Sequence, residues 1–122
     1  RTQERAQALA DAFGPRVKVV SWAERNAAMA DVKLLVNTTT QGMHGQPALD
    51  VRLDELPADA MVSDAIYIPL ETPLLAQARQ RGHVTANGLG MLLNQAVPAF
   101  EAWFGVRPEV TPELRAIVQA TF

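Results

Sequence analysis

The chain has 122 residues and a mass of 13.3 kDa, and its 13 acidic and 11 basic side chains give a formal charge of −2. This length predicts one domain or a piece of a larger one, and 48% hydrophobic with 20% charged residues is typical of a folded protein. The chain has no cysteine and only two histidines, which excludes disulfides, a thiol nucleophile and Cys- or His-rich metal sites. It also has no basic block suited to nucleic acid or a membrane surface, and no apolar run of about 20 residues that would span a membrane.

Helices and strands are predicted to alternate along the first third of the chain. Apolar residues at helical spacing predict a helix over 2–13, with Thr2 as its cap and a Gly-Pro pair as its stop. The β-branched run over 17–20 predicts a short strand. Residues 21–29 begin with Ser-Trp-Ala-Glu, the form of a capping box, and predict a short helix. The apolar run over 34–36 is typical of a strand buried on both faces.

The middle of the chain predicts a loop followed by a strand–helix–strand unit. Polar residues with interspersed Gly and Pro over 41–60 indicate a loop, and residues 61–67 indicate the next strand. A Thr-Pro pair starts a helix over 72–82, because Thr can cap and Pro is tolerated in the first turn. Residues 83–86 predict one more brief strand.

Helices are predicted to close the chain. Residues 89–104 form the longest apolar stretch and have a helical composition, although Pro98 is expected to kink or interrupt the helix. A second Thr-Pro pair starts a last helix at Thr111. Strands separated by helices predict an α/β fold with parallel pairing and right-handed crossovers.

Three loops should carry the function of such a fold, because ligands of open parallel sheets bind outside the carboxyl ends of the strands. These loops are residues 37–43, 67–73 and 87–91, and the last contains two glycines and leads directly into a helix. Glycines there let a ligand approach backbone N–H groups, and a helix start favours a partially negative oxygen. The pattern alone is equally compatible with ordinary turns.

The same loops resemble those of one known family. The motifs are Asn37-x-Thr39-x-x-Gly42-Met43, Asp64-x-x-Tyr67-x-Pro69-Leu70-x-Thr72-Pro73-Leu74-Leu75, Gly88-x-Gly90-Met91-Leu92-x-x-Gln95-Ala96 and, at the start, Arg1-Thr2-x-x-Arg5. Together, in this order and spacing, they resemble shikimate dehydrogenase. The resemblance implies a cytoplasmic NADP-linked oxidoreductase of aromatic amino-acid biosynthesis, which reduces 3-dehydroshikimate to shikimate reversibly.

The resemblance also implies how much of such an enzyme is present. Residues 1–122 would form part of a Rossmann-like NADP-binding domain, a partial parallel sheet flanked by helices, with C-terminal closing helices over 89–122. The family's N-terminal substrate domain, its catalytic Lys and Asp, and its Gly-rich phosphate loop have no counterpart in this chain. We therefore expect no catalytic residue, no metal site and no activity from this segment alone.

Arg1, Thr2 and Arg5 are the predicted contacts to the 2′-phosphate of NADP. Guanidinium groups offer planar, charge-assisted N–H pairs to a phosphate, whereas an NAD-specific protein places an acidic residue there. The alternative interpretation of Arg1 and Arg5 is that they are solvated charges at a helix start.

The other predicted cofactor contacts follow the strands. Thr38 and Thr39 would border the ribose and diphosphate, or alternatively cap a turn with their side chains. By the resemblance, Ala65 borders the nicotinamide through its backbone, and Gly88 and Met91 frame it. Met91 is alternatively a core residue.

Tyr67 and Gln95 are the predicted substrate contacts. The Tyr67 hydroxyl would approach the substrate carboxylate, since a tyrosine ring packs while its O–H donates; it is alternatively a half-buried strand residue. Gln95 lies one helical turn beyond Met91, amid apolar neighbours where a buried amide would be costly, which favours a role in binding substrate. Asn37 and Asp64 are interpreted as residues that hold the loops in shape.

Two alternatives remain open. One is a quinate/shikimate-type relative with a different small-molecule substrate. The other is a non-catalytic, self-associating fragment: in the strand order 3-2-1-4-5-6, missing strands leave sheet edges unpaired. We accordingly expect a homodimer, with no nucleic-acid or membrane partner.

Overall fold

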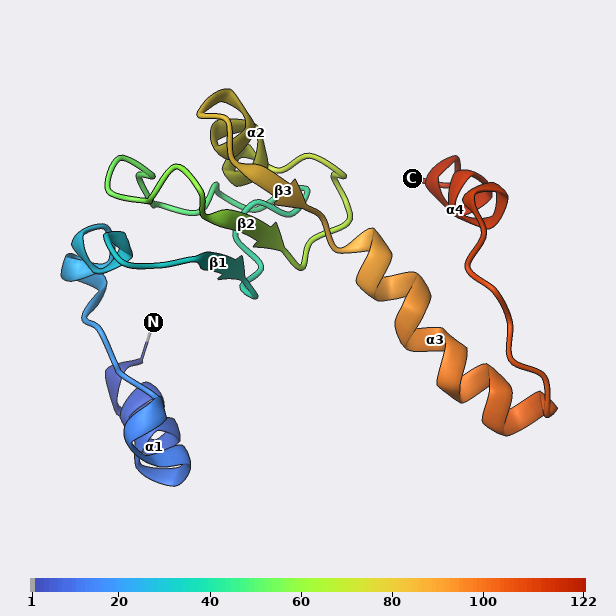
Figure 1. Ribbon diagram of the computed structural model, residues 1–122, viewed down its shortest axis with the longest axis horizontal. Helices are drawn as coiled ribbons and strands as arrows, with labels where there is room; N and C mark the ends of the chain where they lie inside the picture. Colours follow the sequence, from blue (N-terminus) through green and yellow to red (C-terminus); the bar gives the residue numbers. More distant parts are fainter. Residues whose placement is uncertain (1) are drawn as a thin grey trace.

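A parallel three-stranded sheet lies at the centre of the computed structural model, which describes residues 2–122 (Figure 1). Its strands are β1 (Leu34–Asn37), β2 (Met61–Asp64) and β3 (Val84–Ala86), in that spatial order. Leu34 lies opposite Met61, which lies opposite Val84 on its other side, so the carboxyl ends of the strands meet at one edge. The predicted α/β class with parallel pairing is confirmed.

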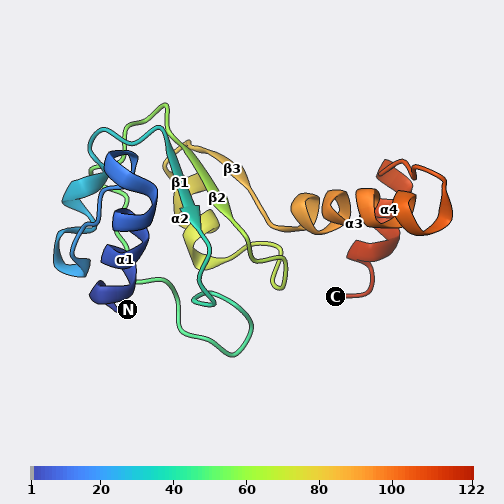
Figure 2. The same cartoon turned by 90° about the horizontal axis from the view of Figure 1, so that it is seen from below.

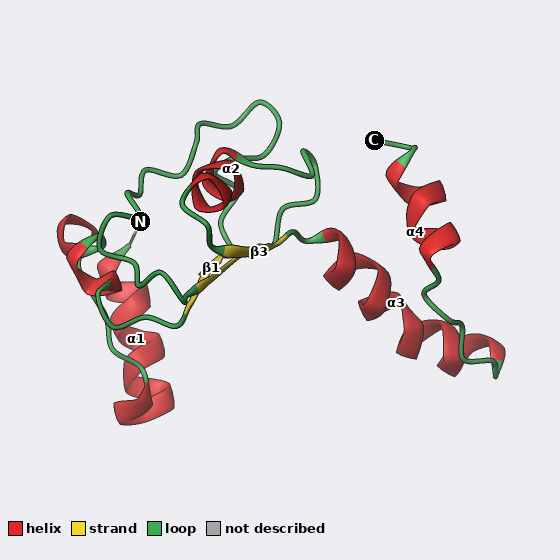
Figure 3. Cartoon of the chain, turned by 45° about the horizontal axis from the view of Figure 1, so that its top comes forward, coloured by secondary structure: helices red, strands yellow, loops and turns green. Residues whose placement is uncertain are grey.

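The described helices surround this sheet unevenly. They are α1 (Gln3–Phe13), α2 (Pro73–Gln80), α3 (Leu89–Phe104) and α4 (Pro112–Gln119). With the sheet seen nearly edge-on, α2 covers one face, and no helix of residues 2–122 packs on the other (Figure 3). Helix α1 lies on the β1 side, whereas α3 extends away from the end of β3 and α4 brings the chain back toward the sheet (Figures 1 and 2).

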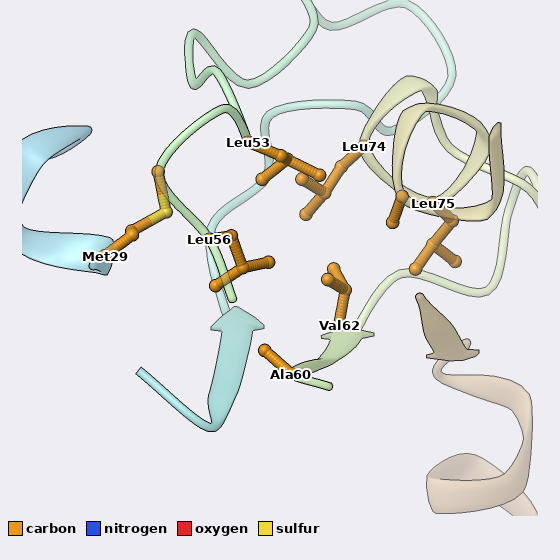
Figure 4. Packing of buried hydrophobic residues seen from close by; sticks show 8 residues of the cluster. Met29, Leu53, Leu56, Ala60, Val62, Leu74 and Leu75 are labelled. Carbon is orange, nitrogen blue, oxygen red and sulfur yellow. The ribbon is translucent and has the colours of Figure 1, made fainter. Parts of the chain in front are cut away.

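The hydrophobic core fills the space between the sheet and α2. Val62 of β2 is fully buried and points toward Leu74 and Leu75 of α2 (Figure 4), and Ala78 of the same helix belongs to the same buried cluster. The long loop before β2 closes the core with Leu53, which is also fully buried, and with Leu56. Each such leucine contributes about 1.5–3 kcal/mol by its removal from water, so this small cluster holds the sheet, the loop and α2 together.

The predicted strand over 17–20 is wrong, and the predicted helix over 21–29 is reduced to turns. Residues 17–20 follow the 3-10 helix η1 (Gly14–Arg16) as irregular chain, because no described strand lies alongside to pair with them. Two single turns, η2 (Trp22–Glu24) and η3 (Ala27–Met29), replace the helix. The hydroxyl of Ser21 donates to the Glu24 carboxylate at 2.7 Å and makes no capping bond to the backbone.

Burial of β1 on both faces is also wrong. Leu35 packs toward the core, but Leu34 and Val36 are 53% and 47% exposed on the face that α2 does not cover. Strand β2 is shorter than predicted and ends at Asp64, because the carboxylate of Asp64, rather than a neighbouring strand, accepts the backbone N–H of Ile66 at 3.0 Å.

Helix α3 runs without a break through Pro98, so of the two predicted effects, a kink or an interruption, the interruption is wrong. Proline removes only the bond that would satisfy the carbonyl of Asn94, and the exposed position of Asn94 leaves that carbonyl accessible to water.

The Thr-Pro starts are confirmed: the Thr72 and Thr111 hydroxyls accept the N–H groups of Leu75 and Leu114 at 3.3 and 3.2 Å. No helix in the described part of the chain combines the length and apolar character needed to cross a membrane.

Candidate functional site

Asp64 joins the loops at the carboxyl ends of β1 and β2. Its side chain is 1% exposed, and its Oδ1 accepts the Asn37 amide at 3.1 Å and the Ile66 N–H at 3.0 Å. Its Oδ2 accepts the Thr72 hydroxyl at 2.7 Å. Burying a carboxylate is costly unless donors surround it, and these three donors meet that requirement. The interpretation of Asp64 as a residue that fixes loop geometry is confirmed.

Asn37 shapes the first loop in the same way. It is 3% exposed, and its Oδ1 accepts both the backbone N–H of Thr39 at 3.0 Å and the Thr39 hydroxyl at 2.8 Å. Its amide nitrogen also donates to the carbonyl of Gln41 at 3.1 Å. Thr39 is thereby held at the rim of the sheet. The predicted role of Asn37, securing the loop backbone, is confirmed.

Gly88 packs the third loop directly on the end of β2. Its N–H donates to the carbonyl of Ile66 at 2.9 Å. A Cβ at this position would lie 2.0 Å from the carbonyl oxygen of Ala65 and 2.5 Å from its carbonyl carbon. The glycine is therefore required by backbone packing within the protein itself, a cause distinct from the close approach of a ligand that its sequence context predicts.

A hollow of about 180 Å³ opens between the first two loops. Its walls are Thr39, Met43, Ala65, Ile66, Tyr67 and Ile68, none of which is charged. It therefore brings together the predicted cofactor residues Thr39 and Ala65 and the predicted substrate residue Tyr67. Because Gly88 touches the backbone of Ala65, the third loop supports one side of this site.

Tyr67 is half-buried and packs against Phe122, a contact that no sequence pattern indicated. The ring centroids lie 5.7 Å apart, with an angle of 42° between the ring planes. Phe122 lies beyond the end of α4, so it is the segment after that helix, and not the helix itself, that contacts the loop after β2. The Tyr67 ring, which carries the hydroxyl, is thus held by its own loop after β2 and by Phe122 after α4.

Several predicted residues lie outside the hollow. Thr38 is exposed, and so are Met91, at 55%, and Gln95 on α3. Exposure of Gln95 removes the argument that burial of its amide would be costly, and Met91 is not a core residue. Thr38 belongs to the loop after β1 and the other two residues to α3, and none of the three lines the hollow itself.

The predicted phosphate contacts lie at the start of α1. Thr2 and Arg5 are exposed there, while Arg1 lies outside the described residues. In Figure 2 the beginning of α1 lies toward the same end of the sheet as the loop that follows β1. The predicted site thus extends along one edge, from α1 past β1 and β2 to the start of α3.

The two histidines lie in different surroundings. His44 is exposed in the first loop, and His83 is buried with its Nδ1 3.1 Å from the carbonyl oxygen of Ala60. Within residues 2–122, no three His, Asp or Glu side chains are grouped so as to hold a metal ion.

Comparison with known proteins identifies relatives of this arrangement. A curated shikimate dehydrogenase (NADP(+)) of Rhodopseudomonas palustris (strain BisB5) is 62% identical over 120 residues, which is 98% of this chain. The chain is homologous to shikimate dehydrogenases. The family profile of the shikimate 5'-dehydrogenase C-terminal domain matches residues 88–116, and the resemblance predicted from the loop motifs is confirmed.

Solved structures of shikimate dehydrogenases and their relatives share the fold. Quinate dehydrogenase from Corynebacterium glutamicum, in complex with NAD, has a TM-score of 0.82 and 35% identity, over 97% of this chain and 43% of its own. Shikimate 5-dehydrogenase from Thermus thermophilus, in complex with NADP(H) and shikimate, has a TM-score of 0.74 and 32% identity, over 89% and 40%. The chain spans 42% of the length of the Rhodopseudomonas shikimate dehydrogenase, so more than half of that relative lies outside the matched region.

Proposed function

We propose that the protein containing this chain is an NADP-dependent shikimate dehydrogenase, which interconverts 3-dehydroshikimate and shikimate in aromatic amino-acid biosynthesis in the cytoplasm. This chain binds the cofactor as a partial Rossmann-like domain and, with the helices over 89–122, closes one side of the substrate site. The observation that carries the proposal is the uncharged hollow that joins Thr39, Ala65 and Tyr67 beside Gly88, in a chain 62% identical to an NADP-linked relative.

The hollow suits the flat nicotinamide end of the proposed cofactor, which carries no phosphate group. Ala65 presents only a methyl group, so a flat ring can lie against its backbone, while Gly88 packs against Ala65 from the protein side. When bound, NADP supplies the hydride that is transferred to or from the substrate. Thr38 and Thr39 border its ribose and diphosphate, and Met91 limits the nicotinamide side of the site.

Tyr67 and Gln95 orient the substrate in this proposal. The phenol donates to the substrate carboxylate, and the Gln95 amide, which is exposed and free to turn, pairs with a hydroxyl or carboxylate oxygen. Neither residue moves a proton in the reaction. The acid–base groups are proposed to belong to the part of the relatives that this chain does not match.

Arg1, Thr2 and Arg5 bind the 2′-phosphate of NADP. A charge-assisted hydrogen bond contributes about 1.5–3 kcal/mol, which is roughly tenfold or more in affinity. We expect Arg5→Gln in the full-length enzyme to raise KM for NADP about tenfold and to leave KM for NAD unchanged. Steady-state kinetics with both cofactors measures this.

Arg16→Gln is the matched control, because Arg16 is also exposed but lies in η1, beyond the far end of α1. It should change neither KM. An equal rise in KM for NADP and for NAD, or no rise in either with Arg5→Gln, would contradict the phosphate assignment.

A quinate/shikimate-type dehydrogenase is the second candidate. It is favoured by the similarity to the quinate dehydrogenase structure in complex with NAD. Turnover of quinate and shikimate by the full-length protein, each with NAD and NADP, separates the two functions. Preference for quinate with NAD would replace the first proposal.

A further inference from the structure

A second hollow, of about 310 Å³, lies at the end of β3, next to the third loop. It is formed where the β2–α2 loop, α2, the β3–α3 junction and α4 meet, and the residues that matter here are Leu70, Arg79, Thr85, Asn87, Gly90 and Arg115. It shares no lining residue with the hollow around Tyr67. None of the residues assigned above to NADP or to the substrate lines it.

The lining of this hollow carries positive charge only. Arg79 and Arg115 are its charged residues, and no acidic side chain lines it. Glu71 lies beside it and contacts Arg79, with Oε1 3.1 Å from Nη2, so one of the two charges is partly balanced. The other charge, on Arg115, is not balanced by a carboxylate within 4.0 Å among residues 2–122.

Arg115 differs from the paired arginines of this chain. Arg25, Arg52, Arg79, Arg81 and Arg107 each contact a carboxylate. Arg115 is instead half-buried, with its Nη1 3.9 Å from the position that a Cβ on Gly90 would take. Withdrawing a guanidinium from water without a counter-charge is unfavourable. An anion in the hollow would supply that counter-charge.

The polar groups of the hollow divide into those already used and those available. The Asn87 amide donates to the carbonyl of Leu70 at 3.1 Å, and its oxygen accepts the N–H of Leu89 at 3.3 Å, so Asn87 only frames the space. The guanidinium of Arg115, the N–H groups of Arg79 that Glu71 does not use, and the hydroxyl of Thr85 are left to donate. Planar guanidinium forks match the oxygens of a phosphate group.

We infer that this hollow is a binding site for a phosphate group, distinct from the proposed NADP site. Arg115 is its principal ligand, and Arg79 and Thr85 complete it. Because Arg115 belongs to α4 and Arg79 to α2, a bound phosphate ties α4 to the sheet. Occupancy therefore stabilises the placement of α4 and of the segment after it, in which Phe122 supports Tyr67.

The test titrates the full-length protein with inorganic phosphate while NADP is saturating, so that the cofactor's own phosphate-binding residues are filled. Isothermal titration calorimetry at constant ionic strength, balanced with chloride, should show saturable binding of one phosphate. Arg115→Gln should weaken it at least tenfold, and Arg79→Gln severalfold. Arg107→Gln is the matched control, because Arg107 pairs with Glu101 outside the hollow, and it should bind phosphate normally.

A parallel titration with glycerol 3-phosphate separates the sources of the group. Tighter binding of the monoester indicates a phosphorylated metabolite, and equal binding indicates free phosphate. Thr85→Val, which keeps the side-chain shape, gives a second variant should Arg115→Gln fail to fold, and it too should weaken binding. Absence of saturable binding, or wild-type binding by Arg115→Gln or Thr85→Val, overturns the inference. Retention of NADP binding by these variants leaves the proposed dehydrogenase function unaffected.

Discussion

Single side chains set the shape of the edge where the strands end. Asp64 holds one loop through Asn37 and the start of α2 through Thr72, while its own backbone turns out of β2. Each of these three polar side chains is at most 3% exposed, so losing one partner leaves another buried and unsatisfied. Gly88 completes this edge by close backbone contact with Ala65 and by the hydrogen bond from its N–H to the carbonyl of Ile66.

Gly88→Ala should be strongly destabilising. Its Cβ would overlap the carbonyl of Ala65, and backing away would break the bond from its N–H to Ile66. We expect a loss of about 3 kcal/mol in the free energy of unfolding, measured by urea denaturation of the full-length protein. Gly90→Ala is the matched control: in the first turn of α3 it meets only Arg115, at 3.9 Å. It should be neutral or stabilise by up to about 1 kcal/mol. Equal stability of both variants would contradict this packing.

At the scale of elements, α2 and α4 begin alike but are anchored differently. Each starts with a threonine cap followed by proline and runs for eight residues. Thr72 is 1% exposed and also donates to the buried Asp64, whereas Thr111 caps its helix and has no buried carboxylate as a partner. Helix α2 further buries Leu74, Leu75 and Ala78 in the core, while no residue of α4 is fully buried.

Thr72→Ala should therefore lower the free energy of unfolding more than Thr111→Ala does. Loss of a threonine cap costs about 1 kcal/mol in either helix. At position 72 the buried oxygen of Asp64 also loses its donor, which adds about 1–3 kcal/mol. Urea midpoints of the two variants measure the difference, and Thr72→Ser, which keeps the hydroxyl, should recover most of it. If the Thr72→Ala variant is as stable as the Thr111→Ala variant, the Asp64 contact contributes little to stability.

At the scale of the whole molecule, much apolar surface has no partner within residues 2–122. One face of the sheet exposes Leu34, Val36 and Val84, and no described helix covers it (Figure 3). A groove of about 470 Å³ between α3 and α4 is lined almost entirely by apolar side chains, and Trp103 beyond it is 78% exposed. Contiguous apolar patches of this kind are rare on proteins that stay monomeric.

The 122-residue chain produced alone should therefore self-associate, as predicted by the homodimer hypothesis. Sedimentation velocity at increasing concentration should show dimers or larger species, because bare apolar faces and the free edge of β1 pair with other copies. Leu34→Lys with Val84→Lys should shift the distribution toward monomer. A well-dispersed monomer of the unmodified chain at high concentration would contradict the expectation.

Much of this protein follows from local sequence. The Thr-Pro pairs start α2 and α4 where predicted, α3 has its predicted bounds, and Asn37 and Asp64 hold the loops as interpreted. These features depend on neighbours in the chain, or on residue types with few ways to be satisfied once buried. The loop motifs likewise identified the family without any knowledge of tertiary contacts.

Tertiary structure alone decided what depends on distant partners. Residues 17–20 have the composition of a strand but no strand beside them, and β1 has an apolar sequence but only one covered face. The exposure of Gln95, the support of Tyr67 by Phe122 and the unpaired charge of Arg115 also arise between segments far apart in the chain. A sequence specifies which groups need a partner, but pairing, burial and charge balance depend on which surfaces the fold brings together.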